Sequence, residues 1–342
     1  MTKAKAPAFT QSWEAHLGDH VVKLAWSPNG RMLAAAAVAG PIALFDAKGL
    51  FLHELPGHNM GTLAVSWSAD SRLLASGGQD GVARIWNVET FGERCQLQGG
   101  AQWVEQVAYS PREDYLATGA GRHLKLWNSA GQLLRTYPPR PSTITDIVWQ
   151  PGQLFFSTAA YGQLATFHAE QAAPVRIFEW KGSILVIAVS PDGNFIATGN
   201  QDASVHFWYR KSGKDLEMSG YPAKVRELSW DSGSRYLATG GSAIVCVWDC
   251  GGKGPAGTRP GQLDAHDRLL SAVAFQNKGG LLASGCLGGD LFLWNPRKPS
   301  APLRGARLEG GITQIRWASD DSQLAAASEN GTVRVFQRME KD

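Results

Sequence analysis

The chain has 342 residues, of which 44% are hydrophobic and 18% charged, and its formal net charge of only +3 does not favour nucleic-acid binding. No apolar run approaches the ~18 residues of a membrane span, and the lysines near the N-terminus are not followed by the apolar segment of a secretory signal. We therefore expect a cytoplasmic globular protein with no nucleic-acid or membrane partner.

The predicted elements form one pattern that recurs eight times, about every 40 to 45 residues. Each copy has an aromatic or apolar anchor, a turn, a strand of small residues and a second aromatic anchor. The first anchors are Trp26, Trp67, Tyr109, Trp149, Val189, Trp230, Phe275 and Trp317. The second anchors are Phe45, Trp86, Trp127, Phe167, Trp208, Trp248, Trp294 and Phe336. A repeat of this period predicts a stacked or radial array rather than one conventional core.

The second copy shows which elements each repeat contains. Residues 63–67, 73–76 and 82–86 predict three strands, and 94–98 a weaker fourth. Asp80-Gly81 predicts a tight turn between the second and third strands. No segment has sustained helical periodicity, so the fold class is all-β. Because one sheet cannot bury both of its faces, repetition of such sheets around an axis predicts a β-propeller.

The sequence resembles the WD-repeat family over essentially its full length. The motif residues of the second copy are Gly57-His58, Trp67-Ser68-Ala69-Asp70, the run 74–81 and Ile85-Trp86-Asn87. Echoes of the motif stand at 190–193 and 237–241, and the literal Trp-Asp pair occurs once, at Trp248-Asp249. The resemblance implies four-stranded antiparallel blades and a non-catalytic scaffold that binds a protein or peptide.

The number of copies predicts a single domain over 1–342 with eight blades. The copies span 21–46, 62–87, 104–128, 144–168, 184–209, 225–249, 270–295 and 312–337. The last copy ends without room for a fourth strand, and residues 8–17 have no inner strands of their own. We therefore predict that 8–17 form the outer strand of the last blade and close the ring. A seven-bladed ring with one stray repeat is the alternative.

One group of polar residues has the residue types of a Ser/His/Asp catalytic set: His58, Ser76, Asp80 and Trp86. In the family that the chain resembles, these positions form a structural network instead. The indole N–H bonds the hydroxyl, the hydroxyl bonds the imidazole, and the imidazole bonds the carboxylate of the turn, so each buried polar group has a partner. The seventh copy has Gly288 at the carboxylate position, and its network is expected to be incomplete.

Metal handling, with zinc, or an enzyme that uses the central channel, is the alternative function. His16, Asp19 and His20 offer three possible ligands in one loop, and His58 is a fourth candidate. No second His or Cys cluster completes a tetrahedral set at a recognised spacing. The absence of a CxxC pair favours reduced, buried thiols for the four cysteines, Cys95, Cys246, Cys250 and Cys286. No glycine-rich phosphate-binding motif is present, so we expect no cofactor and no enzyme activity.

The tryptophans that are not anchors point to a binding face. Trp13, Trp103 and Trp180 are the exceptions; Trp13 lies in the closing strand and Trp180 replaces a network histidine, so packing accounts for both. In the family, the position of Trp103 lies on the rim of the central channel, on the top face formed by the connectors between copies and the turns between second and third strands. We predict that a protein or peptide binds the monomeric ring there, within a complex. The predicted contact residues are Trp103, Tyr161, His20, Lys224, Leu269, Leu287, Gln79 and Gln201.

Overall fold

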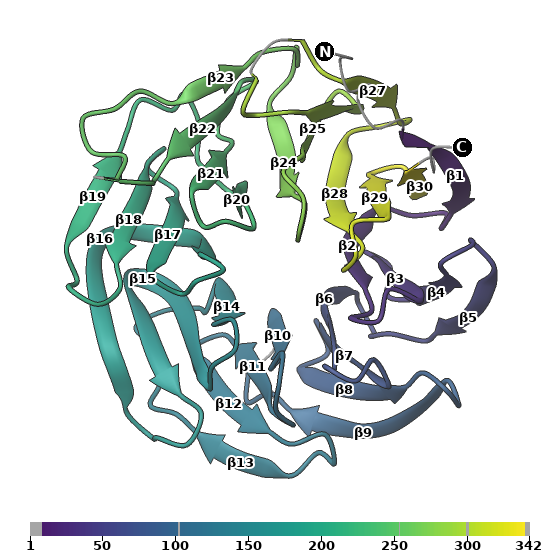
Figure 1. Cartoon of the computed structure of the whole chain (residues 1–342). Coiled ribbons are helices and arrows are strands. Elements are labelled where there is room, and N and C mark those ends of the chain that lie inside the picture. The colour runs from purple at the N-terminus through teal and green to yellow at the C-terminus, as the bar shows by residue number, and fades with distance from the viewer. Residues whose placement is uncertain (1–8, 102, 253, 299–300, 339–342) are drawn as a thin grey trace.

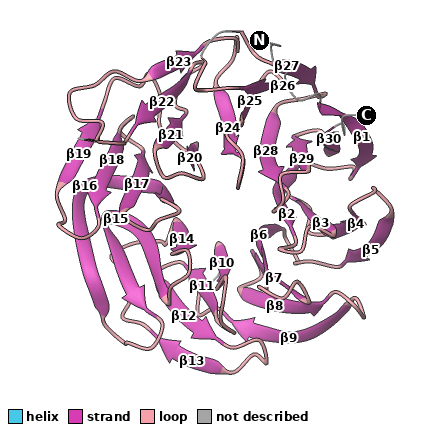
Figure 2. Cartoon of the chain, in the orientation of Figure 1, coloured by secondary structure: helices cyan, strands magenta, loops and turns pink. Residues whose placement is uncertain are grey.

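The computed structural model describes residues 9–101, 103–252, 254–298 and 301–338. In these residues it contains strands and no helix, and the strands form seven sheets around a central axis (Figure 1, Figure 2). No helix in this part of the chain is therefore long and apolar enough to cross a membrane. The all-β propeller of antiparallel sheets expected from the repeat is confirmed.

The strands follow one another with short connections. The first fifteen are β1 Phe9–His16, β2 Val21–Trp26, β3 Met32–Ala37, β4 Ile42–Asp46, β5 Phe51–Leu55, β6 Thr62–Trp67, β7 Leu73–Gly78, β8 Val82–Asn87, β9 Gly92–Gln98, β10 Gln106–Tyr109, β11 Leu116–Ala120, β12 His123–Trp127, β13 Leu133–Thr136, β14 Asp146–Trp149 and β15 Phe155–His168. The others are β16 Pro174–Val189, β17 Phe195–Asn200, β18 Val205–Tyr209, β19 Asp215–Met218, β20 Leu228–Trp230, β21 Tyr236–Thr239, β22 Val245–Asp249, β23 Gly261–Leu263, β24 Leu270–Phe275, β25 Leu282–Cys286, β26 Asp290–Trp294, β27 Arg304–Arg307, β28 Ile312–Trp317, β29 Gln323–Ser328 and β30 Thr332–Arg338.

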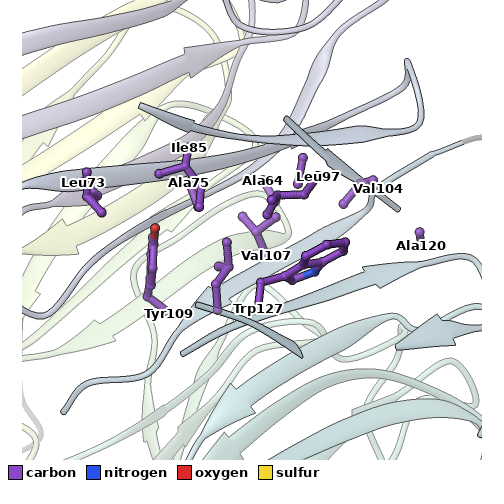
Figure 3. Packing of buried hydrophobic residues seen from close by; sticks show 12 residues of the cluster. Ala64, Leu73, Ala75, Ile85, Leu97, Val104, Val107, Tyr109, Ala120 and Trp127 are labelled. Carbon is purple, nitrogen blue, oxygen red and sulfur yellow. The ribbon is translucent and has the colours of Figure 1, made fainter. Parts of the chain in front are cut away.

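The second strand of each copy is rich in small residues because it is buried between neighbouring sheets. All six residues of β7 are buried, and a Cβ atom on Gly77 would lie only 2.6 Å from the backbone oxygen of Val104 in the next copy. Figure 3 shows the apolar side chains that fill the space between these two sheets, among them Ile85, Val107 and Trp127. Strands of small residues and large aromatic anchors together give the close packing that a protein interior requires.

The first anchors also hold the sheets to one another by hydrogen bonds. The indole Nε1 of Trp67 donates to the backbone oxygen of Ala25 in the preceding copy at 2.9 Å. The same bond recurs from Trp149 to Ala108 and from Trp317 to Ala274, each at 2.9 Å, and from Trp230 to Ala188 at 3.2 Å. Between the last and first copies, the indole Nε1 of Trp26 donates to the backbone oxygen of Arg316 at 3.2 Å. The anchor therefore satisfies its own donor while it joins neighbouring sheets.

The N-terminal strand closes the ring. β1 lies at the outer edge of the sheet β28–β29–β30 and pairs antiparallel with β30, from Phe9 opposite Arg338 to His16 opposite Thr332. Trp13 is buried, and its Nε1 donates to the backbone oxygen of Ala47 in the first copy at 3.2 Å. β1 thus occupies almost the whole of the range 8–17 expected for a closing strand; residue 8 lies outside the described residues.

The expectation of eight separate four-stranded blades is wrong. Six sheets have four strands, and the seventh has six, in the order β14-β15-β16-β17-β18-β19, so that the fourth and fifth copies share one sheet. The cause is that the chain stays extended where the copies meet: Tyr161 pairs with Ser183 at the bend of β15 and β16, and β16 continues from its pairing with β15 into its pairing with β17. No copy is a stray repeat, since all eight contribute strands to the ring.

Candidate functional site

The structure brings His58, Ser76, Asp80 and Trp86 together as a hydrogen-bonded chain. His58 Nδ1 lies 2.8 Å from Asp80 Oδ1, and His58 Nε2 lies 2.7 Å from Ser76 Oγ. Trp86 Nε1 donates to Ser76 Oγ at 2.8 Å. A neutral imidazole that donates from Nδ1 and accepts at Nε2 satisfies all of these groups. Ser76 is fully buried, so its hydroxyl cannot contact a substrate as a nucleophile would.

A cation that sequence reasoning missed completes this network. Arg84 donates from Nη1 to Asp80 Oδ2 at 2.7 Å. Burial opposes ionisation of Asp80, but hydrogen bonds from Arg84 and His58 outweigh it and hold the pKa of Asp80 below its ordinary value. Burial also lowers the pKa of His58, although its bond to Asp80 acts in the other direction. The physical result is a neutral histidine bonded to an ionised carboxylate.

The sixth copy has an equivalent network that the sequence interpretation also missed. There the hydroxyl of Tyr221 lies 2.8 Å from Thr239 Oγ1 and accepts the Nε1 donor of Trp248 at 2.9 Å. A signal was present, because Tyr221 precedes Thr239 by 18 residues, as His58 precedes Ser76. Spacing, rather than residue type, identifies the position.

The seventh copy keeps part of the network. His266 Nε2 lies 2.7 Å from Ser284 Oγ, which accepts the Nε1 donor of Trp294 at 2.7 Å. His266 Nδ1 has no hydrogen-bond partner among the described residues, because Gly288 offers no carboxylate. Burial lowers the pKa of His266 to about 4, against a smaller opposing effect of Asp290 and Asp267.

The top face has a repeated backbone connection. In five copies, a turn residue donates its N–H to the carbonyl of the residue 18 positions earlier, which lies on a connector in four copies and within β16 in the fifth copy. The pairs are Val38 to His20 at 2.8 Å, Gln79 to Gly61 at 3.1 Å, Gln201 to Ser183 at 3.0 Å, Leu287 to Leu269 at 2.9 Å and Glu329 to Gly311 at 2.9 Å. Connector and turn residues of one copy therefore lie side by side at the same end of the ring.

Trp103 is exposed on a connector that is fixed at its base. Its side chain is 47% exposed, whereas the next residue, Val104, is fully buried and donates its N–H to the oxygen of Gly78 at 2.9 Å. This bond places Trp103 beside Gln79 in the turn of the second copy. Gly78 also lies against the His58 ring, since a Cβ atom on it would be 2.2 Å from the ring, so the hydrogen-bonded network adjoins the residue to which Val104 is bonded.

The other apolar candidates are exposed as well. Tyr161 is 57% exposed, Leu269 45% and Leu287 55%, and a backbone hydrogen bond joins the two leucines in the seventh copy. Met60, which the sequence interpretation did not include, is also exposed, next to Gly61. Among the polar candidates, Lys224 and Gln201 are exposed and His20 and Gln79 are half-buried. Tyr161 lies at the bend of β15, and the other seven candidates lie on connectors or turns.

The alternative metal ligands do not form a site. Asp19 uses its two carboxylate oxygens to accept the backbone N–H groups of His20, at 2.7 Å, and Ala39, at 3.0 Å. Both ring nitrogens of His58 are occupied, and His16 is an exposed residue of β1. In the described part of the chain, the group of His, Cys, Asp and Glu side chains close enough to share an ion is a different one: Asp267, Cys286 and Asp290. Nothing in this arrangement supports zinc binding by the four alternative residues.

Comparisons with known proteins agree with this architecture. A family model described as "IFT122 first beta-propeller" matches residues 20–295, and one described as "WD domain, G-beta repeat" matches 297–337. THO complex subunit 3 of Arabidopsis thaliana is 25% identical over 290 residues, which cover 83% of this chain and 78% of that protein. B-type cell cycle switch protein ccs52B of Medicago truncatula is 27% identical over 205 residues, 56% of this chain and 42% of that protein.

Among solved structures, that of the computationally designed Ika8 protein superposes with a TM-score of 0.81 at 21% identity, over 94% of this chain and 97% of that one. At this identity the likeness concerns the fold alone. The repeat, the ring of sheets and the two matching family models lead to one conclusion: the chain belongs to the WD-repeat β-propeller family, with most of its length matching the IFT122 first β-propeller model.

Proposed function

We propose that this protein is a non-catalytic interaction scaffold that binds a protein or peptide on its top face. The observation that carries the proposal is the exposure of Trp103 on a connector whose base is buried and hydrogen-bonded. Tryptophan is favoured at the centres of protein interfaces because it buries a large area with few rotatable bonds. Exposed loops on a rigid frame are also where binding residues concentrate.

The other features of the face support the same function. Tyr161, Leu269 and Leu287 add apolar area, and Lys224, Gln201, Gln79 and His20 supply polar groups of the kind found at interface rims. The buried hydroxyl of Ser76 gives no support to a catalytic role for the one Ser/His/Asp arrangement. The name of one relative, THO complex subunit 3, describes a component of a complex, and by analogy we propose that this ring also acts as a subunit of an assembly.

The test compares substitutions on and off the top face. Proteins retained by the wild-type chain in affinity capture are quantified by mass spectrometry beside those retained by Trp103→Ala and Leu269→Ala. Leu133→Ala is the matched control, because Leu133 is 49% exposed but lies on β13, an outer strand of its sheet. We expect Trp103→Ala to weaken binding of a specific partner by roughly 2 kcal/mol or more, with an unchanged melting temperature. Equal retention by all variants would place recognition elsewhere on the ring.

A further inference from the structure

A cavity of about 450 Å³ lies within the ring, where the strands β2, β6, β10, β14 and β28 face one another (Figure 1). Its lining includes the turns that follow these strands, such as Ser27 and Pro28. Since His20 precedes β2 and Ser27 follows it, the cavity lies toward the end of the ring opposite to the top face. None of the residues proposed for the top face lines this cavity.

Two cations face this cavity from neighbouring strands. Lys23 lies on β2 and Arg316 on β28, and the bond from Trp26 Nε1 to the Arg316 oxygen shows that these strands are adjacent. Arg316 donates from Nη1 to the backbone oxygen of Ile315 at 2.8 Å. Among the described residues, neither cation has a carboxylate within ion-pair distance. The two positive charges thus share one cavity without a direct counterion.

One opposite charge, that of Asp146, lines the same cavity. Asp146 belongs to β14, across the channel from β2 and β28 (Figure 1). Its two carboxylate oxygens accept the backbone N–H groups of Ile147 at 2.9 Å and of Ile187 at 2.8 Å. These bonds fix the carboxylate on its own wall of the channel. The three charged groups leave the cavity with a net positive charge on the side of Lys23 and Arg316.

The two cations that face the cavity repel each other. Burial lowers the pKa of Lys23, and repulsion by Arg316 lowers it further, while Asp146 offsets part of the effect. Arg316 itself is exposed to the open channel, whereas Lys23 is half-buried. Two like charges that face one cavity repel each other, and a bound anion would relieve this repulsion.

We propose that the cavity is a binding site for an oxyanion, a phosphate or carboxylate group held between the ammonium of Lys23 and the guanidinium of Arg316. Arginine and lysine are the side chains that recognise such groups, through charge-assisted hydrogen bonds. Asp146 repels additional negative charge at the opposite wall, so the site takes a ligand with a single anionic group. The oxyanion belongs either to a small phosphorylated molecule or to the carboxylate of a peptide segment that enters the channel.

Titration calorimetry at low ionic strength tests the site, with inorganic phosphate and the blocked peptide acetyl-Gly-Glu-Gly-amide, whose one charge is the glutamate carboxylate, as separate probes. We expect saturable binding with one site per chain for at least one probe, and the probe that binds identifies the source of the oxyanion. Lys23→Met and Arg316→Met should each weaken that binding about tenfold or more, whereas the exposed Lys181→Met should leave it unchanged. Asp146→Asn should tighten it. Absence of saturable binding of both probes, or equal binding by Lys23→Met, would overturn the proposal.

A second measurement needs no substitution in the ring. Wild-type protein is treated with an amine-acetylating reagent in the presence and absence of the binding probe, and the modification of each lysine is measured by mass spectrometry. The probe should protect Lys23 from acetylation and leave Lys181 unprotected. Equal protection of both lysines, or none at Lys23, would show that the anion does not occupy the cavity.

Discussion

The histidine of the seventh copy predicts how the stability of the ring depends on pH. His266 is only 5% exposed, and burial lowers its pKa in the folded protein to about 4, whereas an unfolded histidine has a pKa near 6.5. The unfolded chain therefore binds a proton more readily than the folded one as the pH falls below this ordinary value. Stability is present in full at neutral pH and is lost progressively as the pH falls from about 6.5 toward 4.

The size of the effect follows from the two pKa values. A tenfold difference in proton affinity between the folded and unfolded states corresponds to about 1.4 kcal/mol. Protonation of this one residue should therefore reduce the free energy of unfolding by about 2 kcal/mol at pH 5 and by almost nothing at pH 7.5. The control is His266→Gln, which keeps a neutral polar side chain near Ser284 but cannot take up a proton. It should cost about 1 kcal/mol at pH 7.5 through imperfect hydrogen bonding.

Urea denaturation followed by tryptophan fluorescence measures both proteins at pH 7.5, 6 and 5. Other titrating groups, His58 among them, are common to the two proteins and cancel in the difference. Wild type should therefore lose about 2 kcal/mol more than His266→Gln between pH 7.5 and pH 5. A difference between the two proteins that is the same at all three pH values would refute the reasoning, since His266 would then not be held neutral by burial.

Three further predictions concern the frame of the ring. Asp80→Ala should lower the free energy of unfolding by about 1–3 kcal/mol, and by more than Asp80→Asn, because it leaves the Nδ1 donor of the buried His58 without an acceptor; equal losses in urea denaturation would contradict this. Tyr221→Phe should cost a similar amount by removing the partner of Trp248, and a melting temperature equal to wild type would exclude it. Deleting residues 1–16, which include β1, should expose the edge of β30 and cause aggregation on gel filtration; a soluble, equally stable protein would show that closure by β1 is dispensable.

The regular part of this structure could be predicted because each repeat carries its own local signals. Anchors such as Trp67, the small residues of β7 and the Asp80-Gly81 turn all lie within one copy. The shared six-stranded sheet could not be predicted in the same way. Whether a chain turns or stays extended between copies depends on hydrogen bonds such as the pairing of Tyr161 with Ser183, and these are decided by the neighbouring strands rather than by the local sequence.

The candidate sites also differ in whether local sequence or the assembled ring brings their residues together. The His58 network could be anticipated from the spacing of its members, whereas Arg84 contributes by reaching across from β8 and belongs to no motif. Lys23 and Arg316 lie near opposite ends of the chain, and only closure of the ring makes their strands neighbours. Residues that face the channel from different copies cannot be recognised from the repeat, because each of them differs from the residues at the same position in the other copies.

The division of polar and apolar groups in this ring is consistent with a binding scaffold. The polar side chains with catalytic residue types, His58 and Ser76, are buried and bonded to one another, while Trp103 is exposed nearby. Here the bond from Val104 to Gly78 fixes the backbone of the connector directly after Trp103. A preorganised connector loses less conformational entropy on binding, so under the proposed function the network contributes by positioning the backbone that carries Trp103.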